Sequence, residues 1–134
     1  MPHLVILYTP NIDAMTDMKV LCRSLADAML ALRDENDQQV FPTGGTRVLA
    51  YPAAHYAVAD GENDYGFVYL NIRMAVGRSD GVKQTAGDRL LDVVKLHFAP
   101  IFDSHLIGIT LQIDESPGQV YDGKHSSLHP LFNK

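Results

Sequence analysis

The chain has 134 residues, of which 46% are hydrophobic and 20% charged, and its formal net charge is −5. These values are typical of one globular domain with its own core. The negative charge and the lack of a lysine and arginine cluster exclude a surface that neutralises several phosphates, so we expect no nucleic-acid partner. No apolar run approaches the roughly 18 residues of a membrane span, and we expect no membrane partner. The single cysteine, Cys22, excludes an internal disulfide and fits a reducing cytoplasm, so the expected localisation is cytoplasmic.

The first half of the chain has the pattern strand, helix, strand. Residues 4–8 are a short apolar run that predicts a central strand, and turn residues follow it. From residue 16 to about residue 35, apolar side chains recur every three or four positions, which predicts an amphipathic helix. Its apolar residues are Met18, Leu21, Leu25, Ala28, Met29 and Leu32. A loop over residues 36–45 leads to a second predicted strand over residues 46–51.

The second half repeats this order after a turn-rich joint. A long strand is predicted over residues 65–76, and a turn at residues 77–81 contains Ser79, which suits a helix N-cap. The next predicted helix covers residues 83–102, and its apolar face comprises Ala86, Leu90, Val93, Val94, His97 and Ile101. A last strand is predicted over residues 104–115.

The repeated order predicts an α/β (α+β) fold of two tandem β-α-β units, about residues 2–60 and 61–116, within a single domain of residues 1–134. Helical crossovers are right-handed, so four strands form one sheet with both helices on one face. One side of the last strand, with Ile107, Ile109, Leu111 and Ile113, requires burial, and the other sheet face has no cover. We therefore expect association through the sheets, with the tail at residues 117–134 lying across a neighbouring subunit.

The text MPHLVILY at the start of the chain places a proline before the first predicted strand. If Met1 is retained, Pro2 is an edge residue that cannot donate a ladder hydrogen bond. If Met1 is removed, Pro2 becomes a rigid secondary amine at the tip of a strand. The sequence leaves both interpretations open at this point.

The Met-Pro start and the β-α-β duplication together resemble the tautomerase superfamily, whose members act through an amino-terminal proline. The stretches ADGENDYGFVYLNIRMAVGRS and AGDRLLDVVKLHFAPIFDSHLIGITLQIDE are similar to the 5-carboxymethyl-2-hydroxymuconate isomerase family. The resemblance covers nearly the whole chain. It implies a homotrimeric, cofactor-independent isomerase without a metal, whose partner is a small anionic carboxylate substrate. It also implies the conversion of 5-carboxymethyl-2-hydroxymuconate to its 2-oxo-ene isomer in homoprotocatechuate catabolism.

The resemblance also implies roles for single residues. Pro2 matches the catalytic amino-terminal proline. Two further residues match substrate-binding arginines. They are Arg78, in the sequence G-R-S after the third strand, and Arg47, in the sequence T-R-V of the second strand. The family pattern has more than one arginine near the second of these positions, whereas GGTR contains only Arg47. Arg73 and His3 are further possible site residues.

The chemistry explains why these residue types occur together. A group that takes a proton from an enol oxygen and returns it to carbon works best with a pKa near 7, whereas an α-amine lies near 8. A guanidinium about 6 Å from the amine, at an effective dielectric constant near 20, disfavours the charged form by about 3 kcal/mol, or about two pKa units. An arginine also meets a carboxylate with two parallel hydrogen bonds. Leu4, Phe41 and Phe67 are candidate apolar walls of such a site.

Other interpretations compete with this one. His125 and His129 have a spacing that on a helix would suit a metal, but SSLHP is a poor helix and brings no third ligand, so no metal site is expected. A different proline-based reaction on the same fold is an alternative, as a promiscuous tautomerase, a hydratase or a dehalogenase. A non-catalytic trimeric binding protein that retains Met1 is the alternative from another class.

Overall fold

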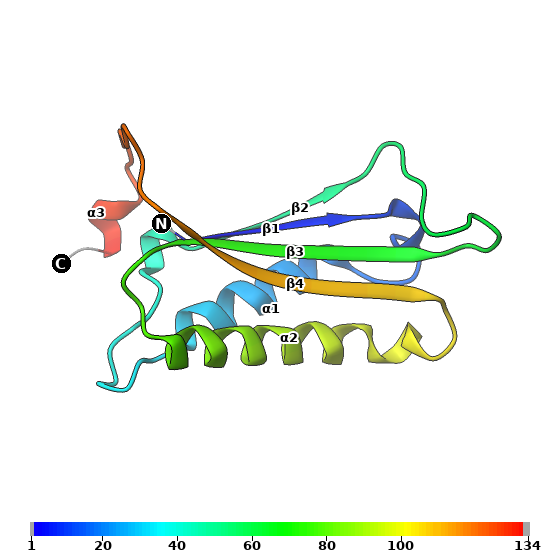
Figure 1. Ribbon diagram of the computed structural model, residues 1–134, viewed down its shortest axis with the longest axis horizontal. Coiled ribbons are helices and arrows are strands. Elements are labelled where there is room, and N and C mark those ends of the chain that lie inside the picture. Colours follow the sequence, from blue (N-terminus) through cyan, green and yellow to red (C-terminus); the bar gives the residue numbers. More distant parts are fainter. Residues whose placement is uncertain (1, 133–134) are drawn as a thin grey trace.

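The computed structural model describes residues 2–132, which form a four-stranded sheet with two long helices on one of its faces (Figure 1). The first half contains β1 (His3–Tyr8), α1 (Met18–Ala31) and β2 (Arg47–Pro52), and the second contains β3 (Gly66–Ala75), α2 (Asp80–Phe102) and β4 (Ile107–Ser116). Three short helical turns complete the described chain: η1 (Pro10–Ile12), η2 (Thr43–Gly45) and α3 (His129–Phe132).

The strand order is β2-β1-β3-β4, so β1 is central, as the sequence predicts. Strand β1 is parallel to β2, and β3 is parallel to β4, because a helix connects the members of each pair. The two β-α-β units join through antiparallel pairing of β1 with β3. The predicted fold class, with two tandem units and both helices on one face, is confirmed.

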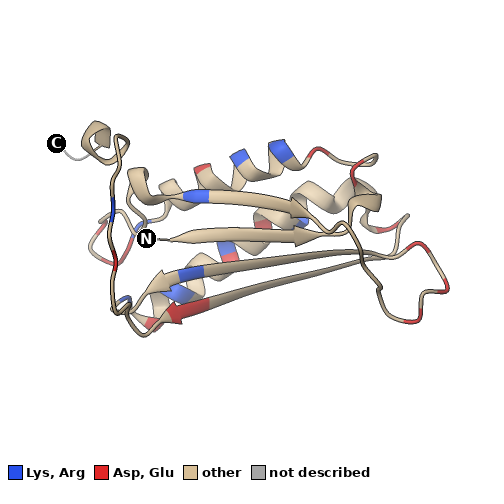
Figure 2. Cartoon of the chain, turned by 90° about the horizontal axis from the view of Figure 1, so that it is seen from above, with Lys and Arg blue, Asp and Glu red and all other residues tan. Residues whose placement is uncertain are grey.

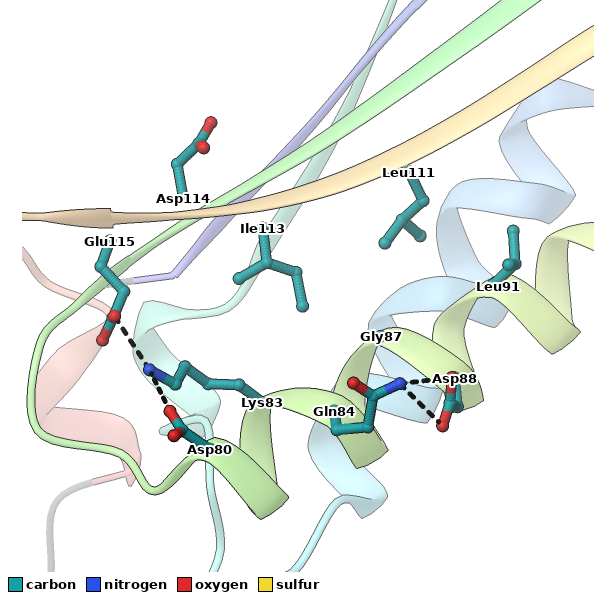
Figure 3. Close-up of a pocket in the computed structure, with 10 residues that line it drawn as sticks. All are labelled: Asp80, Lys83, Gln84, Gly87, Asp88, Leu91, Leu111, Ile113, Asp114 and Glu115. Atoms are coloured by element: carbon teal, nitrogen blue, oxygen red, sulfur yellow. Dashed lines mark hydrogen bonds and ion pairs between the residues drawn. The ribbon is translucent and has the colours of Figure 1, made fainter.

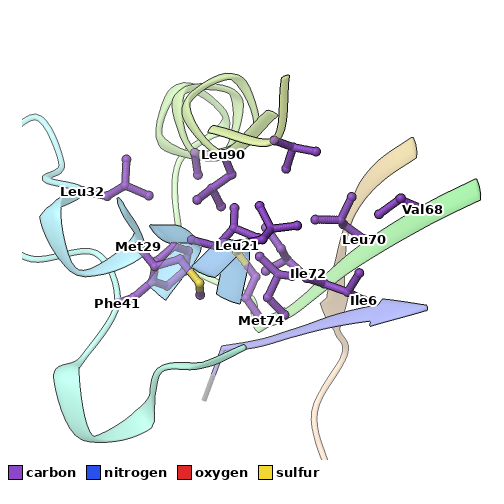
Figure 4. Packing of buried hydrophobic residues seen from close by; sticks show 14 of the residues in the cluster. Ile6, Leu21, Met29, Leu32, Phe41, Val68, Leu70, Ile72, Met74 and Leu90 are labelled. Carbon is purple, nitrogen blue, oxygen red and sulfur yellow. The ribbon is translucent and has the colours of Figure 1, made fainter. Parts of the chain in front are cut away.

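The core lies between the sheet and the two helices (Figure 4). Alternate residues of the central strands point into it, and Leu4, Ile6, Leu70 and Ile72 have no exposed surface. The loop between α1 and β2 also adds a fully buried side chain, Phe41. The fully or almost fully buried side chains of the two helices are Leu21, Leu25 and Met29 from α1, and Ala86, Leu90, Val94 and Phe98 from α2.

Capping side chains set where both long helices begin. Helix α1 begins at Met18, two residues after the predicted start, because the Asp17 carboxylate accepts a hydrogen bond from the N–H of Lys19 at 2.9 Å. Helix α2 begins at Asp80, three residues before the predicted start. There the hydroxyl of Ser79 accepts from the N–H of Val82 at 3.2 Å, which confirms the predicted cap.

Helix α2 ends at Phe102, as predicted, but the strand that follows begins later than predicted. The N–H groups of Ser104 and His105 both bond to the carbonyl of Ile101, at 3.2 and 3.0 Å, so β4 begins at Ile107 rather than at residue 104. Phe98 takes the fully buried place in the last turns of the helix. His97, which was predicted to face the core, lies beside it at the edge and accepts or donates a 2.6 Å hydrogen bond with Thr16.

The apolar side of β4 packs on the core cluster, which also contains the α2 side chains, and therefore does not require a second subunit. The opposite side of the sheet, which we call the open face, has no helix over it in residues 2–132 (Figure 1). Large apolar side chains lie exposed there, with exposed fractions of 47% for Leu7, 43% for Leu49, 50% for Tyr51 and 36% for Phe67. The sequence predicted that the apolar side of β4 needs burial by another subunit. In the structure it is the open face, and not this side of β4, whose large apolar side chains lie exposed.

The tail runs from β4 to α3, and α3 lies against η2 of the same chain (Figure 1). A Cβ atom on Gly44 would come within 3.1 Å of His129 Nδ1, so this contact is close. The expectation that the tail lies across a neighbouring subunit remains a prediction. None of the helices in residues 2–132 has the length and apolar character that crossing a bilayer requires.

Candidate active site

One end of the sheet collects the residues that the sequence singles out. Because β1 and β2 are parallel and β3 runs against β1, the first residues of β1 and β2 meet the last residues of β3 and β4 at this end. The beginning of α2 and the turn η2 lie at the same end (Figure 1). Charged segments of several strands gather near it (Figure 2).

Pro2 is buried directly before β1 at this end. In the Met1-Pro2 sequence its nitrogen is an amide without a proton, so a basic amine exists only once Met1 is removed. Of the predicted apolar walls, Leu4 and Phe41 are fully buried in the core. Phe67 lies at the other end of β1, where its N–H donates to the hydroxyl of Thr9, a strand length from Pro2 of the same chain.

Four side chains form one line across the open face, next to Pro2. Strand pairing sets His3 opposite Arg47 on one side and opposite Arg73 on the other, and it sets Arg73 opposite Asp114. Their chain neighbours in β1 and β3 are buried against the helices, so these four side chains project from the open face. We call Arg47, His3, Arg73 and Asp114 the charged row.

Arg47 and His3 are the half-buried part of the charged row. The Nη1 atom of Arg47 donates to the carbonyl of Gly45 at 3.1 Å, which anchors the guanidinium beside η2. Burial, and then the positive charge of Arg47, lower the pKa of His3 below its ordinary value of 6.5. The imidazole is therefore neutral at pH 7, next to a fixed cation and one residue from Pro2.

Arg73 belongs to the same row but is exposed. The sequence left open whether its side chain points onto the helix face or into the site. Its neighbours Ile72 and Met74 occupy the helix face with at most 2% of their surface exposed, so Arg73 points the other way. The structure thus brings three of the sequence-predicted residues, His3, Arg47 and Arg73, into one line.

Arg78 lies at the same end but is held on the helix side. Its Nη2 atom donates to the carbonyl of Val40 at 3.0 Å and its Nη1 atom to that of Ala75 at 3.3 Å. Its guanidinium carbon lies 5.2 Å from the centroid of the Phe41 ring. Gly77, with a φ of 117°, makes the turn that puts Arg78 there.

The surroundings of Arg78 limit how it can bind an anion. Asp34 and Glu35 line the small pocket of about 170 Å³ beside it, so a carboxylate is unfavourable there. Within residues 2–132 no hydrogen bond or ion pair joins Arg78 to Pro2. A guanidinium has five N–H donors, however, and the two carbonyl bonds leave others for a ligand that approaches from the end of the sheet.

A groove between α2 and β4, with a volume of about 620 Å³, is another cavity near this end (Figure 3). Lys83 lies in it and forms ion pairs with Asp80 at 3.2 Å and with Glu115 at 2.9 Å. Asp88 also lines the groove, and neither Pro2 nor an arginine does. Its excess of carboxylates disfavours an anionic substrate, so we place the candidate site at the sheet end rather than here.

No group of three or more histidine, cysteine, aspartate or glutamate side chains in residues 2–132 is arranged to hold a metal ion. His125 is exposed in the tail, and His129 packs on η2. The residues that sequence reasoning missed are Asp114, which ends the charged row, and Val40, whose carbonyl holds Arg78. Only strand register and loop packing reveal these two, and neither has a local signal in the sequence.

Comparison with known proteins shows similarity to one family of isomerases along the whole chain. A family model described as 5-carboxymethyl-2-hydroxymuconate isomerase matches residues 2–132. The 5-carboxymethyl-2-hydroxymuconate Delta-isomerase of Escherichia coli is 28% identical over 132 residues, which are 98% of this chain and 99% of that protein.

Solved structures agree with the family model. A 5-carboxymethyl-2-hydroxymuconate delta-isomerase is 52% identical with a TM-score of 0.95, covering 100% of this chain and 94% of that one. A 5-carboxymethyl-2-hydroxymuconate isomerase from Deinococcus radiodurans R1 is 32% identical with a TM-score of 0.85, covering 99% and 95%. Structures only 16% and 17% identical share the fold at TM-scores of 0.63 and 0.61. The predicted resemblance is confirmed, and the chain belongs to the 5-carboxymethyl-2-hydroxymuconate isomerase family, a family of enzymes with the tautomerase fold.

Proposed function

We propose that Pro2, once Met1 is removed, is the acid/base of an isomerase that acts on 5-carboxymethyl-2-hydroxymuconate in homoprotocatechuate catabolism. The observation that carries this proposal is the strand pairing that sets the residue after Pro2 against Arg47. Family membership supports the substrate, because a solved structure that is 52% identical to this chain is a 5-carboxymethyl-2-hydroxymuconate delta-isomerase.

The proposed reaction moves one proton through the Pro2 nitrogen. The nitrogen takes the proton of the 2-hydroxyl group, whose O–H electrons form the 2-oxo group while the double bonds shift along the diene. The same nitrogen then returns the proton to the carbon at the far end of the conjugated system. The proline ring fixes the direction of the lone pair, so no torsion has to be ordered at this step.

Arg47 and Arg78 have two tasks in this proposal. Each guanidinium binds substrate oxygens and stabilises the negative charge that grows on the 2-oxo oxygen in the transition state. Their positive charge also disfavours the ammonium form of Pro2, which keeps the amine unprotonated at neutral pH and able to accept the substrate proton. The backbone bonds that hold Arg47 to Gly45 and Arg78 to Val40 support this role, since a pre-oriented donor loses little freedom when substrate binds.

The assembly and its location complete the proposal. A homotrimer would cover the exposed apolar side chains of the open face, which Leu7, Leu49 and Tyr51 exemplify. The protein would work in the cytoplasm, in keeping with its single free cysteine. Light scattering at micromolar concentration should give the mass of a trimer, and a monomer would contradict this part of the proposal.

The acid/base role is tested by three proteins of verified mass. Intact-mass measurement should show that Met1 is absent from the wild type. Pro2→Ala, which leaves a primary amine, and an insertion of one alanine between Met1 and Pro2, which turns the proline nitrogen into an amide, should both lose at least about a hundredfold in kcat/KM. Ultraviolet absorbance of the conjugated diene follows the reaction. Wild-type rates in both variants would refute proline chemistry, and retained Met1 with no turnover would favour a binding protein.

A further inference from the structure

Arg73 is the exposed cation of the charged row. Within residues 2–132 its side chain has no hydrogen bond, ion pair or ring contact. Its neighbour across the sheet, Asp114, is engaged elsewhere, because Asn71 Nδ2 donates to Asp114 Oδ2 at 2.7 Å. Figure 3 shows Asp114 on the side of β4 away from α2, where the open face lies. The guanidinium of Arg73 is therefore free to bind an anion on the open face.

The spacing of the row suits a ligand with two negative groups. Arg47 and Arg73 flank His3 on either side, so they lie two strand spacings apart, or about 10 Å between backbones. Each guanidinium can reach a carboxylate oxygen through hydrogen bonds of about 2.8 Å. A short extended dicarboxylate therefore fits between them, with one end at each arginine.

The charge of the row favours the same class of ligand. His3 separates the two arginines, and burial together with the charge of Arg47 lowers its pKa. At neutral pH the row thus holds two permanent cations with a neutral imidazole between them, in a chain whose net charge is −5. The carboxylate of Asp114 closes one end of the row, so an anion is best placed between Arg73 and Arg47.

We propose that Arg73 binds the second carboxylate of the substrate and makes the enzyme prefer dicarboxylates to monocarboxylates. The role in catalysis rests on the proposed function, whereas the anion subsite itself does not. Arg73 is a specificity-determining residue in this proposal, and the proton transfer at Pro2 does not involve it. Its loss should weaken binding of the substrate without slowing the chemical step.

A binding experiment with unreactive probes tests the subsite directly. Adipate and hexanoate have the same chain length and differ by one carboxylate. In wild-type protein of verified mass, calorimetry should show adipate binding roughly tenfold more tightly than hexanoate, the contribution of one charge-assisted contact. Arg73→Gln should reduce this ratio to less than about twofold, and Arg73→Lys should keep part of it. Arg89→Gln, which removes an exposed charge from α2, is the matched control and should leave the ratio unchanged.

Steady-state kinetics test the proposed subsite at Arg73 independently of the proposed acid/base role of Pro2. Arg73→Gln should raise KM for 5-carboxymethyl-2-hydroxymuconate roughly tenfold with kcat within about threefold of wild type, and it should leave turnover of the monocarboxylic enol of phenylpyruvate unchanged. An adipate preference that persists in Arg73→Gln, or is absent from the wild type, overturns the subsite even if Pro2→Ala is inactive. Conversely, if Pro2→Ala is fully active while Arg73→Gln loses the preference, the subsite stands and the proposed function fails.

Discussion

The two faces of the sheet use the same strands for opposite purposes. Along β3, Val68, Leu70 and Ile72 are fully buried against the helices, whereas the alternate residues Tyr69, Asn71 and Arg73 face the open side. The helix face of β3 has no polar side chain, and the open face of the sheet combines exposed apolar side chains with the charged row. One face therefore supplies most of the apolar burial that stabilises the fold, and the other carries the proposed contacts for assembly and for substrate.

The largest expected difference between the faces is in stability, and two adjacent residues of β3 reveal it. Ile72→Ala should lower the free energy of unfolding by about 2–5 kcal/mol, because it removes fully buried methyl groups and leaves a cavity. Arg73→Gln, one position further, should change it by no more than about 0.5 kcal/mol, since the side chain is exposed and unpaired within residues 2–132. Urea unfolding at one fixed protein concentration measures both. Equal losses would show that the faces are not distinct.

A second test concerns assembly rather than folding. Leu7 is 47% exposed on the open face, and Leu96 is 79% exposed on α2. Leu7→Lys should dissociate the proposed trimer at micromolar concentration, because a charge would be buried in the contact and repeated in every subunit. Leu96→Lys, which adds the same charge away from the open face, should leave the molecular mass unchanged. Light scattering measures both, and a trimeric Leu7→Lys protein would show that the open face is not the interface.

The smallest expected effect is a salt-dependent change in the pKa of two histidines, His3 in the sheet and His97 in helix α2. Burial is the main cause that lowers the pKa of both His3 and His97, but Arg47 lowers that of His3 further whereas Asp17 raises that of His97. Raising the salt concentration from about 0.01 to about 1 M screens these charges. The pKa of His3 should then rise and that of His97 should fall, each by a few tenths of a unit. Titration followed by NMR measures the shifts, and shifts of the same sign would contradict the assignment.

Acid should destabilise the fold through the same two imidazoles. Both have folded-state pKa values below 6.5, so the unfolded chain binds more protons as the pH falls. Their stabilising contribution is complete above about pH 6.5 and is lost as the pH falls through the folded values. His97→Gln should therefore flatten the decline in unfolding free energy between about pH 6.5 and pH 5.

Local patterns predicted most of the fold. The apolar periodicity of the first helix, the cap at Ser79 and the order of the strands correspond to the structure. The errors lie at the ends of helices and strands, where single hydrogen bonds decide at which residue the element begins. The cap at Asp17 starts α1 two residues after the predicted position, and the hydrogen bonds to the carbonyl of Ile101 place the start of β4 at Ile107 rather than at residue 104. For the candidate site, Pro2 and the arginines could be proposed from the sequence, but the place of Arg78 on Phe41 could not.

The order of strands and helices and the family could be predicted from the amino-acid sequence, because the first depends on neighbours within a few positions and the second on similarity along the whole chain. The position of His3 between Arg47 and Arg73, and the packing of the β4 isoleucines on the core cluster with α2, became visible in the folded chain alone. Both depend on strand register. Alternation divides a strand into two sets of side chains, but which set is buried, and which residue lies opposite, depends on pairing between distant segments.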